Sequence, residues 1–341
     1  MPYTVTLQPS GHRFTAREDQ TLLEAALETG RHVPYGCRNG ACGACKVKVL
    51  AGEFDHGPTQ DGGLPLDDRE KGHALLCCAR ALSDMTIECP EARAASEITV
   101  KTMPVRVSLL ERLAPDVMRL RLQLPSSERL RFLAGQYVEF ILKDGGRRAF
   151  SIANAPQDDN QIELHIRRVP GGKFTEQVFV TLKERDILRI EGPHGSFHLR
   201  EDGERPLLMV AGGTGFAPLK AIIEDMIHRQ IVRPIHFYWG ARDRAGLYLH
   251  ELVAGWVREH EHLRYIPVLS EPGADDAWSG RTGLVHTAVL ADHVSLAGFD
   301  AYVCGAPAMV EAAKRDFVAA GLPAERFFAD VFSYATPGAG T

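Results

Sequence analysis

The pattern of apolar and polar positions changes character along the chain, and its first part predicts a strand followed by a helix. Residues 3–7 alternate between apolar and polar side chains, as in a strand with one buried face. Apolar residues from Thr21 to Leu27 then recur at helical spacing. Gly30 follows at the place where a helix often ends on a left-handed glycine.

Two further strands are predicted in the first third of the chain. Residues 45–54 and 85–89 have strand character, and the polar, turn-rich stretch 61–72 between them predicts a surface loop. Residues 90–97 lack periodicity and are rich in small and charged side chains, which is typical of a linker. The first third is therefore expected to form one small β-rich domain.

The middle third predicts a small antiparallel barrel, because short strands with turn signals between them follow one another closely from Val105 onward. Six strands are expected, at residues 105–110, 117–124, 136–142, 147–153, 162–169 and 187–192.

From Pro206 the pattern changes to strands that alternate with helices, which predicts parallel βαβ units. An apolar run, a glycine turn and a helical stretch lead to a strand at 235–240, and the alternation continues to 300–307. The chain is thus predicted to be a multidomain protein with a β-rich domain, an antiparallel β-barrel and an α/β parallel-sheet domain. The expected boundaries are 1–92 for the first domain, 93–101 for a linker, 102–203 for the barrel, 204–335 for the α/β domain and 336–341 for a tail.

Composition and charge narrow the class of protein. The 341 residues are 45% hydrophobic and 24% charged, as in an ordinary globular protein. The first residues lack a signal sequence and no stretch approaches the ~20 apolar residues of a membrane span, so a cytoplasmic location is expected. The net charge of −5 gives no reason to expect nucleic-acid binding. Most of this negative charge lies in residues 1–92, where it could steer a basic partner surface.

Cysteines supply the most specific chemical signal. Cys37, Cys42 and Cys45 have C-x4-C-x2-C spacing and Cys77 follows downstream, which is the plant-type arrangement for a 2Fe–2S cluster. Glycines interleave with them, and a loop that wraps inorganic sulfide needs residues without a Cβ. Structural zinc is the rival interpretation, but zinc sites favour paired C-x2-C units and this sequence has one.

The fourth ligand has two adjacent candidates, since Cys78 follows Cys77 directly. The surrounding segment resembles that of plant-type ferredoxins, in which the ligand precedes a serine–aspartate pair by six residues. Counting back from Ser83, this resemblance implies Cys77. Cys78 is then expected to be a buried small apolar residue, and Cys89 has no recognisable pattern.

Two motifs in the barrel could bind a dinucleotide. On the strand 147–153, Arg148 could hold a pyrophosphate, the Phe150 ring could cover the ligand and Ser151 could bond a ring nitrogen, although an exposed arginine beside a core phenylalanine is the simpler interpretation. Downstream, a glycine turn that opens a helix would present free N–H groups to phosphate, or it could be an ordinary loop and N-cap. This turn contains Gly171, Gly172, Lys173 and Thr175.

A third motif, at residues 206–223, has the strand, glycine turn and helix that a dinucleotide-binding turn requires. It departs from the full fingerprint because Pro218 stands where the third glycine would be, but proline is tolerated in the first turn of a helix. Cys304 and Gly305 end a later strand, at the sheet edge where parallel sheets bind ligands. The candidate turn residues are Gly212, Gly213, Thr214, Gly215 and Pro218.

The order of these motifs resembles the ferredoxin–NAD(P)+ reductase family in its oxygenase-reductase form with an N-terminal plant-type ferredoxin domain, and within it the branch of CDP-6-deoxy-glucoseen reductases. The resemblance covers nearly the whole chain. It implies a β-grasp fold for the first domain and FAD as the flavin. Arg148, Phe150 and Ser151 would lie along the FAD, Gly172 to Thr175 would hold its pyrophosphate, and Phe332 would shield the isoalloxazine.

The expected reaction follows from what each cofactor carries. A nicotinamide gives a hydride, which is two electrons, whereas a 2Fe–2S cluster accepts one, so a flavin is needed between them. Ser151 is expected beside the flavin N5, and Cys304 beside the nicotinamide. The resemblance favours NADH. Arginine would suit the 2′-phosphate of NADPH, whereas a carboxylate would suit the 2′-hydroxyl of NADH. The chain offers both, in Arg242 and its neighbours Asp243 and Arg244, so NADPH is kept as an alternative.

The expected partner is a separate terminal acceptor protein, for which two classes remain open. One is an iron oxygenase, and the other is a pyridoxamine-phosphate-dependent dehydrase that acts on a CDP-sugar. A stand-alone flavin reductase spanning residues 102–335 is an alternative, but it would need no iron. A non-enzymatic iron–sulfur carrier is opposed by the two nucleotide-binding regions.

Overall fold

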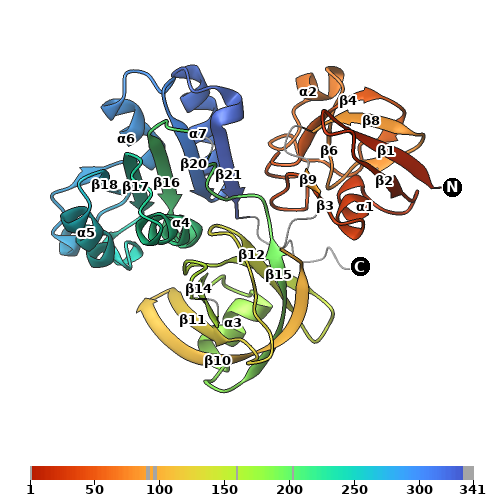
Figure 1. Ribbon diagram of the computed structural model, residues 1–341. Coiled ribbons are helices and arrows are strands. Elements are labelled where there is room, and N and C mark those ends of the chain that lie inside the picture. Colours follow the sequence, from red (N-terminus) through yellow and green to blue (C-terminus); the bar gives the residue numbers. More distant parts are fainter. Residues whose placement is uncertain (1, 90–92, 95–97, 159, 202, 333–341) are drawn as a thin grey trace. The chain divides into compact units, whose positions relative to one another are not determined.

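The computed structural model describes residues 2–89, 93–94, 98–158, 160–201 and 203–332 (Figure 1). The chain forms two compact units, one of residues up to Thr99 together with a short segment from Ala329, and the other from Val100 to Phe328. Residues 95–97 of the predicted linker 93–101, and the predicted tail 336–341, lie outside the described residues. Within the linker, β9 (Arg93–Ala94) pairs antiparallel with β3 (Arg31–His32), so part of this segment is a short strand. The exact domain boundaries stay a prediction.

The first unit has the β-grasp fold, a mixed sheet packed on one main helix (Figure 1). Its strand order is β2-β1-β8-β4-β6, with β1 parallel to β8 and antiparallel to β2. The small pair β5–β7 lies outside this sheet. The bounds are β1 Tyr3–Gln8, β2 Arg13–Ala16, β4 Lys46–Ala51, β5 Phe54–Asp55, β6 His73–Leu75, β7 Arg80–Ala81 and β8 Met85–Glu88.

Helix α1 (Leu22–Glu28) begins and ends where the sequence predicts. The Thr21 side chain accepts from the Glu24 N–H while the Glu24 carboxylate accepts from the Thr21 N–H, which satisfies two N–H groups that an uncapped helix would leave unpaired. Gly30 follows in the left-handed conformation with φ of 69°. The buried face of the helix closes the core of this unit.

The prediction of a polar loop at 61–72 was wrong for its second half, where the short helix α2 (Leu66–Glu70) forms. Asp67 and Asp68 stand in its first turn, where the helix dipole favours negative charge. Leu64 is fully buried and anchors the segment, and Lys46 forms a 2.7 Å ion pair with Asp68. The polar composition of the segment predicted a loop, although the buried Leu64 fixes it to the core.

The second unit begins with the predicted antiparallel barrel, in the strand order β13-β12-β15-β10-β11-β14 (Figure 1). Its two outer strands meet at a bridge between Ile152 and Leu164, and α3 (Lys173–Val180) packs Phe174 and Val178 into the core. The first strand starts before the predicted Val105, because it continues through Pro104, which pairs with Arg189. The bounds are β10 Lys101–Ala114, β11 Val117–Gln123, β12 Tyr137–Ile141, β13 Arg147–Ser151, β14 Gln161–Arg167 and β15 Ile187–His194.

The remaining residues form the predicted parallel sheet with helices packed on it, in the order β19-β18-β17-β16-β20-β21. Because the paired strands β16 to β20 run parallel, the carboxyl ends of the central strands β16 and β20 meet at one edge, which is where such sheets hold ligands. The strand bounds are β16 Leu207–Gly212, β17 Ile235–Ala241, β18 Leu263–Leu269, β19 Arg281–Thr282, β20 Asp300–Gly305 and β21 Phe327–Val331. The helices are α4 Phe216–His228, α5 His250–Glu259, α6 Val285–Asp292 and α7 Pro307–Ala319.

Among the described residues, no helix is both long and apolar enough to pass through a bilayer.

Candidate functional site

The four predicted cluster ligands gather from two separate segments. Cys37, Cys42 and Cys45 lie in the loop before β4, and Cys77 lies just after β6. The Cys45 and Cys77 Sγ atoms are 3.3 Å apart. The backbone N–H groups of Cys37 and Cys42 each donate to the sulfur of the other, over 3.4 and 3.3 Å. The spacing in the sequence therefore corresponds to a sulfur-lined site in space.

Glycine is required in this loop by the close approach of other atoms. Gly40 has φ of 78°, and a Cβ there would lie 2.9 Å from the Cys78 sulfur and 3.0 Å from the Pro58 carbonyl. Gly43 has φ of 71°, and a Cβ there would lie 2.9 Å from the Gly63 carbonyl. The backbone N–H of Gly40 also donates to Cys77. The loop can bend around the sulfurs because these positions carry no side chain.

The sulfur atoms differ in their tendency to ionise. Hydrogen bonds from the thiols of Cys45 and Cys78 lower the pKa of Cys77 to about 3, and the Cys42 thiol lowers that of Cys37 to about 7. The pKa values of the donors Cys42 and Cys45 rise in turn. Iron binds thiolate, and the site offers four sulfurs backed by N–H donors. This donor set fits a 2Fe–2S cluster.

The other two cysteines of this unit are both buried. Cys78 is 4% exposed, as expected of a small core residue, but its sulfur also lies 3.6 Å from that of Cys77. Cys89 is 1% exposed and follows β8 directly. Sequence reasoning did not anticipate the contact between Cys77 and Cys78.

Cys77→Ser is expected to lose most of the cluster, because a serine oxygen is a poor replacement for a thiolate on iron. Wild-type protein should contain about two irons per chain, and the variant less than half of that, measured by iron analysis and visible absorption. Cys89→Ser is the matched control and should keep the iron. A wild-type cluster in Cys77→Ser would contradict the ligand assignment.

The predicted flavin strand is β13, and its residues divide between the surface and the core. The Arg148 guanidinium donates to the Arg147 carbonyl over 2.7 Å, and no described carboxylate pairs with it. The Phe150 ring packs on Phe140 and Phe174, at centroid distances of 5.8 and 5.5 Å, so part of it serves the barrel core. Ser151 is buried. The positive charge available at Arg148 suits a phosphate, and its role stays a prediction.

The predicted phosphate turn lies at the start of α3, which Gly172 caps. Thr175 Oγ1 accepts from the Val169 N–H and donates to the Val169 carbonyl, both over 3.1 Å, so this hydroxyl connects the two ends of the turn. A Cβ at Gly172 would lie 2.6 Å from that hydroxyl. Lys173 forms a 2.9 Å ion pair with Asp144. The unpaired backbone N–H groups of the first helical turn are therefore better suited to phosphate than the Thr175 side chain.

The predicted nicotinamide turn joins β16 to α4, and the end of β20 lies against it. A Cβ at Gly215 would lie 2.1 Å from the Cys304 carbonyl oxygen, so only glycine lets the two chains approach. The Trp239 indole N–H donates to the Gly213 carbonyl over 2.9 Å. Pro218 is the third residue of α4, within the first turn, as expected. Cys304 is fully buried.

The remaining predicted residues lie at strand ends. Arg242 is exposed directly after β17. Its neighbour Asp243 accepts a 2.9 Å hydrogen bond from the Gly246 N–H, and Arg244 donates to Asp276. Phe332 follows β21 directly and is partly exposed. Their roles at the adenosine ribose and the isoalloxazine stay predictions.

Gly215→Ala is expected to destabilise the second unit by about 1–3 kcal/mol, because the new methyl group would collide with the Cys304 carbonyl and force β20 away from the turn. Thermal or urea unfolding of the full chain measures the effect. Gly255→Ala in α5 is the control, since its Cβ would meet only the Arg258 side chain at 3.7 Å. Equal stability of the two variants would show that the close approach is not needed.

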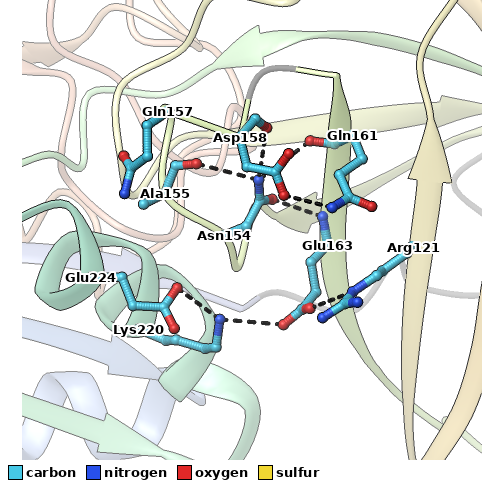
Figure 2. Close-up of a pocket in the computed structure, with 9 residues that line it drawn as sticks. All are labelled: Arg121, Asn154, Ala155, Gln157, Asp158, Gln161, Glu163, Lys220 and Glu224. Carbon is cyan, nitrogen blue, oxygen red and sulfur yellow. Dashed lines mark hydrogen bonds and ion pairs between the residues drawn. The ribbon is translucent and has the colours of Figure 1, made fainter. Parts of the chain in front are cut away.

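A buried charge network between the barrel and α4 was missed by sequence reasoning (Figure 2). Lys220 on α4 is 5% exposed and donates to the Ala153 carbonyl over 3.0 Å, just beyond β13. Its ammonium also lies 3.3 Å from Glu163 and 2.8 Å from Glu224. The His165 ring bonds Glu163 on one side and the Tyr248 hydroxyl on the other, each over 3.0 Å. The network ties the flavin strand to the helix that begins at the nicotinamide turn.

Burial and neighbouring charges decide which side chains of this network are ionised. Burial alone would raise the pKa of Glu163, but the hydrogen bond from His165 and the charges of Lys220 and Arg119 outweigh it and hold this pKa far below the usual range. Burial lowers the pKa of His165, so the ring stays neutral. A pocket of about 350 Å³ adjoins the network and is lined by Arg121, Asn154, Ala155, Gln157, Asp158, Gln161, Glu163, Lys220 and Glu224 (Figure 2).

One signal could have revealed this network. Glu163 and His165 stand two residues apart and alternate with the core residues Ile162, Leu164 and Ile166, so they share a face that the barrel core does not use. Their partner Lys220 lies far away in the sequence, and nothing in the local pattern pairs it with them.

Stability is expected to fall on acidification in two steps. The pKa of the buried His165 is lowered, so its contribution to folded-state stability is lost as the pH falls below 6.5. The pKa of Glu163 is lowered as well, so its contribution is lost as the pH falls below 4.5. In both cases the unfolded chain takes up the proton first. In His165→Gln the free energy of unfolding should depend less on pH between pH 6.5 and 5. Thermal unfolding should show a slope that is smaller than that of the wild type by up to about 1.4 kcal/mol per pH unit. His228→Gln, at an exposed site, is the control. An unchanged slope in His165→Gln would contradict the assignment.

Three family models match successive parts of the chain. A 2Fe-2S iron-sulfur cluster binding domain matches residues 5–82, an oxidoreductase FAD-binding domain matches 104–199 and an oxidoreductase NAD-binding domain matches 209–315. A CDP-6-deoxy-L-threo-D-glycero-4-hexulose-3-dehydrase reductase of Yersinia pestis is 41% identical over 97% of this chain and 99% of its own length. The chain belongs to the ferredoxin–NAD(P)+ reductase family, in its oxygenase-reductase form.

Other relatives extend this picture of the reductase. The reductase component 1 of a Comamonas terephthalate 1,2-dioxygenase is 36% identical over 99% of both chains. The crystal structure of a cytochrome P450 reductase of Amycolatopsis superimposes with a TM-score of 0.81 and 36% identity, over 98% of this chain and 100% of that one. The reductase is thus an NAD(P)H-dependent oxidoreductase that uses FAD and a 2Fe–2S cluster to pass electrons to a separate protein.

Proposed function

We propose that the acceptor protein is a CDP-sugar 3-dehydrase that carries pyridoxamine phosphate. The observation that supports this choice is the 41% identity, over all three domains, to the reductase of such a dehydrase. An iron oxygenase is the second candidate, favoured by the structural likeness to a cytochrome P450 reductase and by the dioxygenase reductase component.

The residues of the first unit would hold the cluster and control access to it. Cys37, Cys42, Cys45 and Cys77 supply the sulfur ligands, and the bent backbone at Gly40 and Gly43 presents N–H groups around them. Cys37 and Cys42 are partly exposed, so this side of the site is open to a partner. The surplus of acidic residues in this part of the chain would attract a basic acceptor surface.

Residues of the second unit, together with the predicted Phe332, would bind the two nucleotides. Arg148, Phe150 and Ser151 would lie along the FAD, with the turn Gly171 to Thr175 at its pyrophosphate and Phe332 at its ring. The turn Gly212–Gly215, followed by Pro218, would present N–H groups to the pyrophosphate of NADH. Cys304 and Gly305 would border the nicotinamide and Arg242 the adenosine ribose. When bound, FAD accepts two electrons together and releases them singly, which neither of the other cofactors does.

These side chains bind and orient rather than exchange protons with substrate. The buried link from Lys220 to the Ala153 carbonyl would hold the flavin strand at a fixed distance from the nicotinamide turn. The closely packed, fully buried end of β20 would keep water out on the nicotinamide side. Electron transfer needs this fixed geometry more than it needs an acid or a base.

The proposal is tested with the full-length reductase and two purified acceptors, the CDP-sugar dehydrase with its substrate and an aromatic-ring oxygenase with its own. NADH-dependent product formation should be at least tenfold faster with the dehydrase. Cys77→Ser should abolish this reaction but keep NADH oxidation by ferricyanide, which needs only the flavin. Faster turnover with the oxygenase would replace the first candidate by the second, and failure with both would overturn both.

A further inference from the structure

Cys78 has a defined position beside the cluster site that no assigned role explains. Its sulfur lies 3.6 Å from the Cys77 sulfur, within range of an S–H···S hydrogen bond, and its side chain is 4% exposed. Its N–H donates to the Leu75 carbonyl over 3.0 Å, and a Cβ at Gly57 would collide with its carbonyl oxygen. Backbone contacts on both sides therefore keep the thiol at this distance.

Ligand counting leaves Cys78 with its proton. Two tetrahedral irons with two bridging sulfides require four protein sulfurs, and Cys37, Cys42, Cys45 and Cys77 supply them. A fifth buried thiol that does not bind iron keeps its proton and can donate. The sulfur of the adjacent ligand Cys77 lies within range as an acceptor.

We propose that the Cys78 thiol donates a hydrogen bond to the Cys77 sulfur and thereby raises the reduction potential of the cluster. The inference rests on the proposed role of Cys77 as a ligand. Reduction adds negative charge that is shared by the ligand sulfurs, so a donor on one of them stabilises the reduced state more than the oxidised state. The S–H group is a weak donor, but burial removes the competing hydrogen bonds of water.

The consequence concerns the direction of electron flow. A cluster with a higher potential accepts electrons from the flavin more readily and gives them to the acceptor less readily. Cys78 would thus adjust the reduction potential of the cluster relative to those of the flavin and the acceptor, without contact with NADH or FAD. It is a positioning residue that acts through Cys77.

The test compares three full-length variants by redox titration, with the reduced cluster followed by EPR and visible absorption. Cys78→Ala removes the donor and should shift the cluster potential in the negative direction. Cys78→Ser keeps a donor, through its hydroxyl, and should stay at or above the wild-type value. Cys89→Ala makes the same truncation at another buried cysteine of this unit and should have no effect. Iron content near two per chain verifies that each cluster is intact.

A role in packing alone predicts a different result, namely that alanine and serine shift the potential equally or not at all, and this would overturn the proposal. If Cys78→Ala does not fold, the infrared S–H stretching band of the wild-type protein decides. The band that Cys78→Ser removes should lie at lower frequency than the band of a small alkanethiol in an apolar solvent, and a Cys78 band at the frequency of that reference would refute the hydrogen bond. An error in the ligand assignment is detected separately, because Cys77→Ser would then keep its cluster.

Discussion

Four sulfur atoms from two distant segments have to approach one another, and the backbone around them is bent to permit this. Left-handed glycines at 40 and 43 remove the side chains that would block the approach, and the turn after β6 carries Cys77 to the same place. N–H or S–H groups donate to the sulfur atoms of Cys37, Cys42 and Cys77. The β-grasp sheet and α1 provide the rigid frame without which a loop so poor in side chains would not keep this shape.

In the second unit, the ends of two strands have to lie close together. At the end of β16 the chain must turn close to the end of β20, and Gly215 permits contact with the Cys304 carbonyl. The barrel and the parallel sheet are then joined by buried charges, with Lys220 between Glu163 and the Ala153 carbonyl. Buried charges cost several kcal/mol in desolvation unless they are paired, so such a network fixes one geometry of the interface more strictly than apolar contacts would.

The order of elements could be read from the chain because it follows from local pattern. Closely spaced short strands with turn signals predicted the six barrel strands, helical spacing together with Thr21 and Gly30 predicted α1, and the glycine turn after an apolar strand predicted the start of α4. The polar segment 61–72 misled because its buried Leu64 packs in the core, and β10 begins at Lys101 rather than at Val105. In both places a contact with a distant residue outweighed the local signal.

The sequence by itself determined the domain types and the ligand spacing, because cysteine offsets, glycine positions and hydrophobic periods are properties of neighbouring residues. Only the tertiary structure decided which side chains meet across the chain. It brought Lys220 to Glu163 and His165, and it turned the Cys78 sulfur towards Cys77. Such contacts depend on how strands and loops pack in three dimensions, and a linear pattern contains no record of the distances between them.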